Sequence, residues 1–585
     1  MLPVPEAPSN LWILHRRTSL CHSSSWQQGA GGCAPSRPAT RPTASTEARA
    51  PTPPPRLETA GQPPPRGQRN QAGRSLVAKA TGSAPLSTAG SAQQRDAPLF
   101  ADYRPSHGYD EYFRSADQPR SALQPLLSSL GRIGLEQLNR DHAAAAALLK
   151  RLGATFRLND SGRQGVERIL PFDPLPRLIA AEEWERLERG LFQRLMAIDL
   201  FLADVYGPGR ILNDGVVPRE DVESSQGWRP QMRGITPPLG RWCHISGLDL
   251  VRDGQGTWRV LEDNLRCPSG VAYFLENRRV MKRIFPSLFA GRAVQPIDNY
   301  ASELLRTLQD LAPWTDTPKV VLLTPGVFNS AYFEHSYLAQ QMGIELVEGR
   351  DLVCEGERVW MRSTTGLTPV DVIYRRIDDD FLDPAVFRPD SMLGVRGLMA
   401  AYRAGRVAIA NAPGTGVADD KLIYAYVPAM IRYYLDQDPI IENVPTWLCA
   451  RPDDRAHVLA HLRDLVVKSV AEAGGYGMLI GPHASEAEIA DFAARIEAEP
   501  RNFIAQPTLE LSTVPSLSEG ELYPCHVDLR PYVLRGSGDW VTPGGLTRVA
   551  LRRGSLVVNS SQGGGCKDTW IVDDTGIGAM SGAQG

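Results

Sequence analysis

A helical pattern of apolar and polar residues runs from Ala181 to Tyr206. Its apolar positions recur at three- and four-residue intervals, which places them on one face of a helix: Trp184, Leu187, Leu191, Leu195, Ile198 and Leu202. We predict a core helix here. A second helical stretch, from Gln137 to Leu152, contains five consecutive alanines.

The pattern then changes to that of a strand, a turn and a second strand. Residues 245–251 are largely apolar and alternate with polar residues, as in a strand. Residues 252–256 contain the turn formers aspartate and glycine, and residues 258–261 form a second strand pattern. We predict an antiparallel hairpin. If its second strand continues, Glu262, Asn264 and Arg266 share a face, because alternate residues of a strand point the same way.

Strands alternate with helices in the middle of the chain. An apolar run at 320–323 ends in a glycine turn, and a helical pattern follows at 332–342. Further strand patterns lie at 344–347, 370–374 and 407–410. This alternation favours a small parallel sheet.

The region after residue 415 is mostly strands, with two helical stretches at 422–435 and 456–463. Its strand patterns lie at 465–468, 478–480, 503–506, 526–533, 547–551 and 555–559. Taken with the earlier elements, they predict an α/β (α+β) protein.

The length of 585 residues suggests three or four structural units, at roughly 100–200 residues per domain. The patterns divide the chain into an N-terminal region at 98–300, a parallel-sheet domain at 301–414 and a strand-rich part at 415–575. A flexible tail is expected at 576–585.

Residues 1–97 differ in composition, being rich in Pro, Ser, Ala, Gly, Arg and Gln, and we predict them to be disordered. Three interpretations are open. The many arginines and serines fit an organelle transit peptide, whereas the apolar run at 11–14 is too short for a secretory signal. The stretch could also precede the natural start of the protein. We favour this last interpretation or a dispensable tail, and we assign no function to it.

The charge balance is close to neutral, with 63 Lys and Arg against 66 Asp and Glu. A dedicated electrostatic nucleic-acid binder needs a basic excess, so we expect no nucleic-acid partner. No apolar run approaches the roughly 18–20 residues that span a bilayer, so we expect no membrane partner. The 8 cysteines form no C-x-x-C pair, which argues against a zinc site or a disulfide framework, and we expect a cytoplasmic protein.

The predicted hairpin carries residues suited to a divalent cation. Glu262 and Asn264 offer a carboxylate and an amide oxygen, and Asp249 on the partner strand can supply a second carboxylate. With bound phosphates, these hard oxygens suit Mg²⁺, which takes one or two protein carboxylates and keeps waters. The guanidinium of Arg266 suits charge stabilisation on a transferring phosphoryl group. A surface ion-pair ladder is the alternative interpretation.

Phosphate-binding candidates lie far downstream. Lys468 ends an apolar strand and precedes a loop with Gly474 and Gly475, a pattern that can hold phosphates by point charge and backbone N–H groups. Lys421 offers a second lysine at a helix start. The strand through Gln506 leads into a proline-bent loop that could face an adenine edge. Each feature also has an ordinary structural interpretation as a strand end, a helix cap or a hinge.

Three further charged residues follow on strands. Asp528 and Arg530 share one face of a strand, and Arg548 lies on another. Pro531 follows Arg530 directly, so the strand is expected to lie at an edge or to contain a bulge. Later, Asn559 precedes a run that ends in three glycines, which permits close approach of a ligand.

Together these candidates resemble the ATP-grasp superfamily in shifted order. An ATP-grasp ligase ordinarily ends with the paired-acid hairpin that carries E-x-N and its arginine, whereas here that hairpin comes first. The chain therefore resembles the bacterial circularly permuted ATP-grasp family over about four-fifths of its length. The sequence phrases that carry the resemblance are residues 107–112, 170–177, 324–326, 374–380 and 557–565.

The resemblance implies an ATP-grasp fold with an inserted pre-ATP-grasp-like domain, and ATP and Mg²⁺ as cofactors. It implies that Asp249, Glu262 and Asn264 hold magnesium. It implies charge stabilisation by Arg266, Arg530 and Arg548. The implied nucleotide contacts are Lys421, Lys468, Gly474, Gly475, Gln506, Leu509 and Asn559. The candidate substrate contacts are Asn329, His335, Arg375 and Arg376, with the alternative that they are ordinary polar residues of the surface or the core.

The better-understood relatives of this family are peptide-bond-forming ligases such as glutathionylspermidine synthase. The resemblance thus implies a ligase that joins a carboxylate of a small molecule or peptide to an amine through an acyl phosphate. Three alternatives stay open: an ATP-binding scaffold without turnover, a hydrolase that uses a carboxylate pair, and a small-molecule kinase. The acid, the amine and the oligomeric state are not determined.

Overall fold

The structure of the protein is a computed structural model. It describes residues 99–106, 108–116, 118–160, 163–471, 477–552, 554–558 and 564–573. All of these described residues belong to one compact unit. The expected tails at 1–97 and 576–585 lie outside the described residues. No helix in the described part of the chain combines the length and apolarity that crossing a membrane requires.

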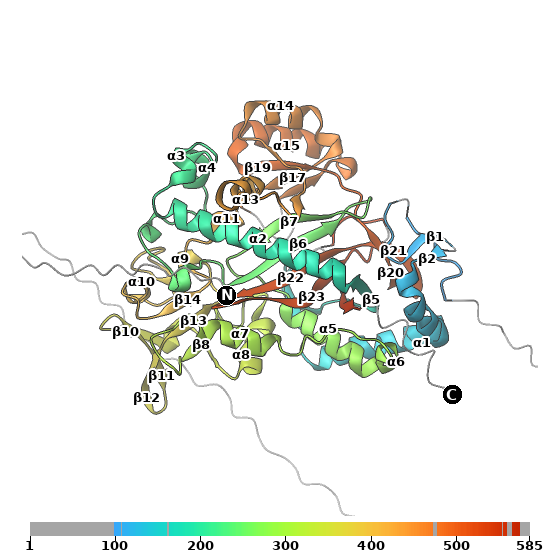
Figure 1. The fold of residues 1–585 in the computed structure, drawn as a ribbon, viewed down its shortest axis with the longest axis horizontal. Coiled ribbons are helices and arrows are strands. Elements are labelled where there is room, and N and C mark those ends of the chain that lie inside the picture. The colour runs from blue at the N-terminus through green and yellow to red at the C-terminus, as the bar shows by residue number, and fades with distance from the viewer. Residues whose placement is uncertain are drawn as a thin grey trace, which may run out of the picture. The chain divides into compact units, whose positions relative to one another are not determined.

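A seven-stranded sheet, in the order β15-β7-β6-β22-β23-β24-β5, carries much of the fold (Figure 1). Its two outermost pairs are parallel and the inner pairs are antiparallel. The strands are β5 (Phe172–Ala180), β6 (Ile245–Arg252), β7 (Trp258–Asn264), β15 (Glu442–Asn443), β22 (Asp528–Arg535), β23 (Asp539–Val549) and β24 (Gly565–Val572). The sheet therefore joins strands from the early and the late parts of the chain.

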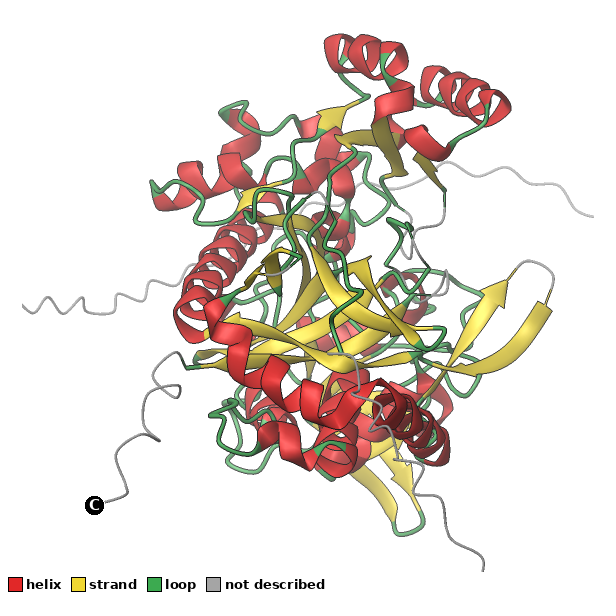
Figure 2. Cartoon of the chain, turned by 90° about the vertical axis from the view of Figure 1, so that its right-hand side faces the viewer, coloured by secondary structure: helices red, strands yellow, loops and turns green. Residues whose placement is uncertain are grey.

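Helices cover both faces of this sheet, because its strands alternate between two apolar cores (Figure 2). Leu248 and Leu250 of β6 share a core with α2 (Ala181–Val205), whose predicted apolar stripe is buried. Ile245 of the same strand shares the opposite core with α5 (Val271–Ile284) and α7 (Tyr300–Gln309). The core helix and the hairpin expected from the sequence are thus confirmed.

A second sheet, in the order β14-β13-β8-β9, is parallel throughout, as the alternation of strands and helices predicted. Its strands are β8 (Val320–Leu323), β9 (Glu345–Val347), β13 (Val372–Arg375) and β14 (Ala408–Ala410). The elements connected to it are α8 (Tyr332–Met342), β10 (Leu352–Glu355), β11 (Arg358–Ser363), β12 (Gly366–Val370), α9 (Asp379–Leu382) and α10 (Leu398–Arg403).

A third, antiparallel sheet has the order β16-β19-β17-β18 and packs with helices α14 and α15 around a small core of its own (Figure 1). Its strands are β16 (Trp447–Leu448), β17 (Leu465–Ser469), β18 (Met478–Ile480) and β19 (Phe503–Pro507). The helices of this part of the chain are α11 (Gly416–Asp419), α12 (Lys421–Tyr424), α13 (Val427–Leu435), α14 (Pro452–Ala460) and α15 (Glu486–Ala498).

Three short hairpins and several helices complete the described chain. The hairpins are β1 (Phe113–Ser115) with β2 (Gln118–Pro119), β3 (Thr155–Asp160) with β4 (Arg163–Ile169), and β20 (Thr513–Ser518) with β21 (Glu521–His526). The helices are α1 (Gln124–Arg151), α3 (Arg210–Asn213), α4 (Arg219–Glu223) and α6 (Pro286–Phe289).

Some predicted elements were wrong in extent. The helix expected at 422–435 is divided into α12 and α13, because Pro428 lies in the first turn of α13 and cannot continue a preceding helix. The strand expected at 555–559 is absent from the described residues 554–558, and the last strand is β24 instead. Helix α1 begins before the predicted stretch and bends at Gly134, where φ is 72°.

Pro531 lies in β22, an inner strand of the large sheet, and the register shifts between Pro531 and Val533. The bulge expected from this proline is therefore present, while the alternative of an edge strand is wrong.

Candidate functional site

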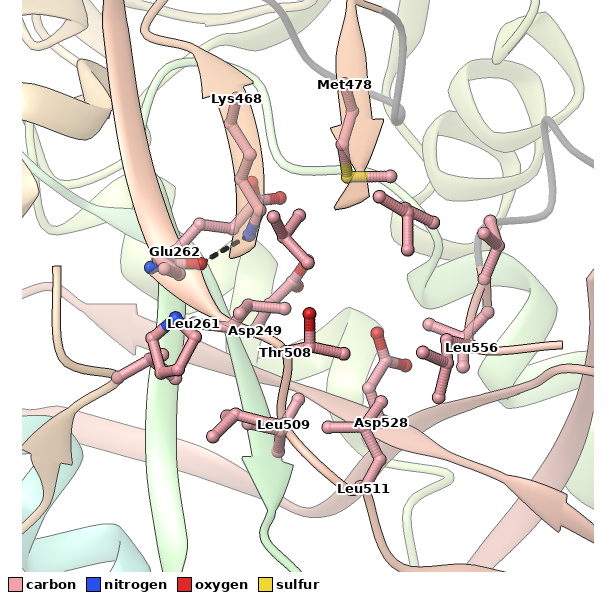
Figure 3. A pocket seen from close by; sticks show the side chains of 18 of the residues that line it. Asp249, Leu261, Glu262, Lys468, Met478, Thr508, Leu509, Leu511, Asp528 and Leu556 are labelled. Carbon is pink, nitrogen blue, oxygen red and sulfur yellow. Dashed lines mark hydrogen bonds between the residues drawn. The ribbon is translucent and has the colours of Figure 1, made fainter. Parts of the chain in front are cut away.

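A cleft that is open to solvent lies between the large sheet and the β16-β19-β17-β18 sheet. Strands β6, β7, β22 and β23 contribute one side, and β17, β18 and β19 contribute the other. Figure 3 shows Lys468 and Met478 on one side of the cleft and Leu509, Leu511 and Asp528 on the other. Two sheets thus close around one space from opposite directions.

Much of the lining is apolar, which suits a flat aromatic group better than a charged one. The apolar side chains that line the cleft are Val251, Leu261, Val444, Val466, Met478, Ile480, Leu509, Leu511, Leu556, Val557 and Val558. The charged and amide side chains in the lining are Asp249, Glu262, Lys421, Lys468, Gln506, Asp528 and Arg548. This combination of an apolar wall with convergent charges is what a nucleotide requires.

The hairpin β6–β7 places Asp249 directly opposite Glu262 in the strand register, which shifts immediately after Asp249. Asn264, two residues further along the same strand as Glu262, donates from Nδ2 to Glu262 Oε1 at 3.3 Å. Asp249 is buried, whereas the Glu262 side chain is 19% exposed and borders the cleft. The three side chains predicted to hold a metal therefore lie together, with Asp249 and Glu262 in the lining of the cleft.

Two arginines from β22 and β23 bind the buried carboxylates behind this end of the cleft. Arg530 donates from Nε to Asp249 at 2.5 Å and from Nη2 at 2.8 Å, and Arg548 donates to the same carboxylate at 2.6 Å. Arg548 also holds Asp528 through Nε at 3.0 Å. Burial alone would raise the pKa of Asp249, but the charges of Arg530 and Arg548 hold this pKa below its usual range.

Lys468 and Lys421 bring two ammonium groups into the same cleft. Lys468, on β17, donates from Nζ to Gln506 Oε1 on β19 at 2.7 Å. Burial lowers the pKa of Lys468 to about 8. Lys421 begins α12, where Asp420 caps the helix by accepting from the Leu422 N–H, and its Nζ lies 3.4 Å from Glu262.

The proline-bent loop after β19 forms part of the apolar wall. Gln506 donates from Nε2 to Thr446 Oγ1 at 3.1 Å, which orients its amide. Thr508 donates from its hydroxyl to the Asp464 carbonyl at 2.9 Å, and Leu509 lines the cleft next to it. The loop is therefore held in place by contacts on its outer side, with Leu509 facing the space where a base would lie.

The donor chemistry at the hairpin fits magnesium. Glu262 lines the cleft and Asn264, bonded to it, carries a second hard oxygen, and Mg²⁺ prefers few protein ligands with water and phosphate oxygens. Both oxygens of Asp249 already accept from guanidinium groups, so Glu262 is the more available carboxylate. In the described residues, no three His, Cys, Asp or Glu side chains gather so that they could hold a metal by themselves. Water and phosphate oxygens would complete the coordination.

Arg266 departs from its expected position. Strand β7 ends at Asn264, so the alternation does not carry Arg266 onto the face of Glu262. Its Nε donates to Asp419 at 2.6 Å, and its Nη1 donates to Asp378 at 3.3 Å. The carboxylate of Asp419 raises the pKa of Arg266, against the effect of burial. Arg266 therefore lies at the junction between the cleft and the parallel sheet.

Three of the four candidate substrate contacts are buried with partners inside the protein. Arg375 pairs with Asp379 at 2.7 Å and donates to the Asn411 carbonyl, and Arg376 pairs with Glu334 at 2.9 Å. Buried His335 bonds the Thr324 hydroxyl at 2.9 Å. Asn329 is half-buried in the loop after β8 and accepts from the Ala331 N–H.

Three nucleotide contacts implied by the resemblance, Gly474, Gly475 and Asn559, lie outside the described residues. Sequence reasoning missed Thr446 and Asp464, which orient the hinge, and Asp419 as the partner of Arg266. Single polar residues in loops carry no periodic signal, so only the position of Asp419 two residues before Lys421 gave a hint.

Two sheets face one cleft, with acids from the large sheet, Lys468 from the other sheet and Lys421 from α12, and this arrangement is that of an ATP-grasp protein. The chain belongs to the circularly permuted ATP-grasp type 2 family, whose family model matches residues 176–550. The early position of the acidic hairpin in the chain is the permuted order that the sequence indicated.

Relatives and a solved structure agree with this membership. An uncharacterized protein of Synechocystis sp. is 61% identical over 473 residues, covering 80% of this chain and 98% of the relative. A Frankia alni protein that bears the provisional name of a glutamate–cysteine ligase is 42% identical, covering 85% of this chain and 57% of that longer protein. A glutathione synthetase-like effector from Globodera pallida, solved in its apo form, superposes with a TM-score of 0.50 at 12% identity, over 74% of this chain and 96% of its own, which supports the fold alone.

Proposed function

We propose that the protein is an ATP-dependent carboxylate–amine ligase that forms an amide bond through an acyl phosphate. The observation that carries this proposal is the meeting of Glu262 with Lys421 and Lys468 around one cleft, although the acid and the lysines lie far apart in the chain. Membership in the ATP-grasp family and the ligase name of the Frankia relative support an ATP-dependent ligase in general.

Each part of the cleft has a role in this proposal. Glu262 and Asn264, with Asp249, would hold magnesium, which when bound neutralises phosphate charge. Lys421 and Lys468 would hold the phosphates, and the apolar wall with Leu509 would hold the base. Arg530 and Arg548 keep Asp249 ionised and contribute positive charge behind the phosphates. Arg266, held by Asp419 and Asp378, would stabilise charge during transfer.

The proposed chemistry needs no protein nucleophile. An oxygen of the substrate carboxylate attacks the γ-phosphorus of ATP, the bond from that phosphorus to the bridging oxygen breaks, and ADP leaves. The nitrogen of the amine then attacks the acyl carbon, phosphate departs with the electron pair of its C–O bond, and the nitrogen loses a proton. The protein contributes positioning and charge neutralisation.

The proposal is tested by incubating the full-length protein with ATP, Mg²⁺ and pools of amino acids, peptides and polyamines. ADP formation that depends on a pool member and yields an amide is expected, and Glu262→Ala and Lys468→Ala should abolish it. Lys282→Ala is the matched control, because Lys282 pairs with Asp298 at the surface. Hydroxylamine should trap the acyl phosphate as a hydroxamate. A phosphorylated end product would indicate a kinase, and tight ATP binding without turnover would indicate a scaffold; either result would contradict the ligase.

A further inference from the structure

The segment at 108–113 runs beside Thr513, just after the loop at 507–511 that follows β19 (the hinge loop), although the two are distant in the chain. Thr513 donates from its backbone N–H to the Tyr109 carbonyl at 2.9 Å, and Glu111 donates back to the Thr513 carbonyl at 2.8 Å. The carboxylate of Asp110 accepts from the Thr513 hydroxyl at 3.0 Å. This segment lies outside residues 176–550, the region that the family model matches.

Glu111 is the buried centre of this contact. Its carboxylate accepts from Arg177 Nε at 2.8 Å and Nη2 at 2.6 Å, and from the Ser512 hydroxyl at 2.7 Å. Both members of the ion pair are buried, at 2% and 0% side-chain exposure. Burial alone would raise the pKa of Glu111, but the charges of Arg177 and Arg252 lower this pKa to about 2. Glu111 therefore stays ionised at neutral pH.

The partners of Glu111 lead directly to the cleft. Ser512 follows Leu511, which lines the cleft. The backbone N–H of Ser512 donates to the Arg252 carbonyl at 2.8 Å. Arg177 donates from Nη1 to the backbone carbonyl of Asp528 at 2.9 Å, and Asp528 also lines the cleft. One carboxylate therefore ties the hinge loop to the large sheet.

We propose that Glu111 is a positioning residue of the nucleotide site, which holds the loop at 507–511 in the conformation that receives the base. This inference rests on the proposed function, because it assumes that the cleft binds ATP. It predicts an effect on the base and not on the phosphates, since Lys421 and Lys468 are carried by α12 and β17.

The test compares the affinities of the full chain for ATP and for inorganic tripolyphosphate, both with Mg²⁺, by calorimetry. Glu111→Gln is expected to weaken ATP binding about tenfold and to leave tripolyphosphate within about twofold, because it removes the charge that holds Ser512 and Arg177 together while Lys421 and Lys468 are unchanged. Ser512→Ala keeps the ion pair and removes one hydrogen bond, so about a threefold loss for ATP alone is expected.

Asp568→Asn is the matched control, because Asp568 forms an equally buried pair with Arg278 at 2.7 Å and does not line the cleft. It should lower the melting temperature as Glu111→Gln does, without changing the ratio of the two affinities. Equal weakening of ATP and tripolyphosphate, or unchanged ATP affinity in both hinge variants, would overturn the inference. If Glu111→Gln fails to fold, Ser512→Ala decides. Absence of ATP binding in the unaltered protein would instead overturn the proposed function.

Discussion

Lys468 on β17 and Gln506 on β19 are joined by a hydrogen bond of 2.7 Å from the ammonium group to the amide oxygen. The amide nitrogen of Gln506 is committed to Thr446, so the oxygen is the end that faces the lysine. An ammonium group has three N–H donors, and one bond to Gln506 leaves donors that can reach a phosphate. The hinge strand thus positions the lysine that we assign to the nucleotide.

The first prediction concerns pH. Since burial lowers the pKa of Lys468 to about 8, the lysine loses its charge well below the usual range for lysine. ATP affinity measured by calorimetry is expected to fall about three- to tenfold between pH 7 and 9.5. Lys468→Arg, which stays charged, should show a flat profile over the same range. A profile that declines equally in both proteins would contradict the assignment.

The same shift has a consequence for folding, of opposite sign. Because the pKa of Lys468 is lower in the folded protein than in the unfolded chain, keeping the buried lysine charged costs stability below pH 8. That cost is relieved as the pH rises from 8 toward 10.5, the unfolded value. Lys468→Met should remove this contribution to the pH dependence of unfolding by urea.

A second prediction concerns magnesium. Glu262→Gln removes the most available carboxylate while keeping its shape, and turnover is expected to fall about a hundredfold or more, with a weaker response to added Mg²⁺. The melting temperature should change little, because the side chain is partly exposed. Glu442→Gln, an exposed position on β15 of the same sheet, is the control and should retain activity.

The third prediction concerns the buried arginine of β23. Arg548→Met leaves Asp249 and Asp528 buried without one of their shared cations, and unfolding by urea should show a loss of about 3–5 kcal/mol. Adding Asp528→Asn to this variant removes one uncompensated charge and should restore part of the loss. A double variant less stable than the single one would mean that the charge balance is not what Arg548 provides.

The fourth prediction concerns His335, a buried histidine on α8. Burial, with the charge of Arg376, lowers the pKa of His335 to about 2. The unfolded chain gains a proton near pH 6.5 that the folded protein does not, so His335 makes stability fall as the pH drops below 6.5. Over the interval from pH 6.5 to 5 this amounts to about 2 kcal/mol or less. His335→Asn should flatten the slope of stability against pH in this interval, and an unchanged slope would exclude the effect.

Elements that depend on near neighbours could be predicted from the sequence. The apolar stripe of α2, the β6–β7 hairpin and the parallel order of β8, β13 and β14 all follow from periodicities of a few residues. The pairing of Asp249 with Glu262 does not follow from the turn, whose register would place Asp249 opposite Leu261; the register shift between Asp249 and Leu250 brings Glu262 there instead. The family resemblance added the permuted order, which no local pattern contains.

Only the tertiary structure determined the partners of the charged side chains. A guanidinium group takes the nearest carboxylate in space, and for Arg266 that is Asp419, 153 residues away. Arg375 and Arg376 were candidate substrate contacts, and folding buries them against Asp379 and Glu334. Glu111 and Ser512 meet across 401 residues. Periodicity determines which side of an element is apolar, but the long-range packing of those apolar faces determines which charges meet.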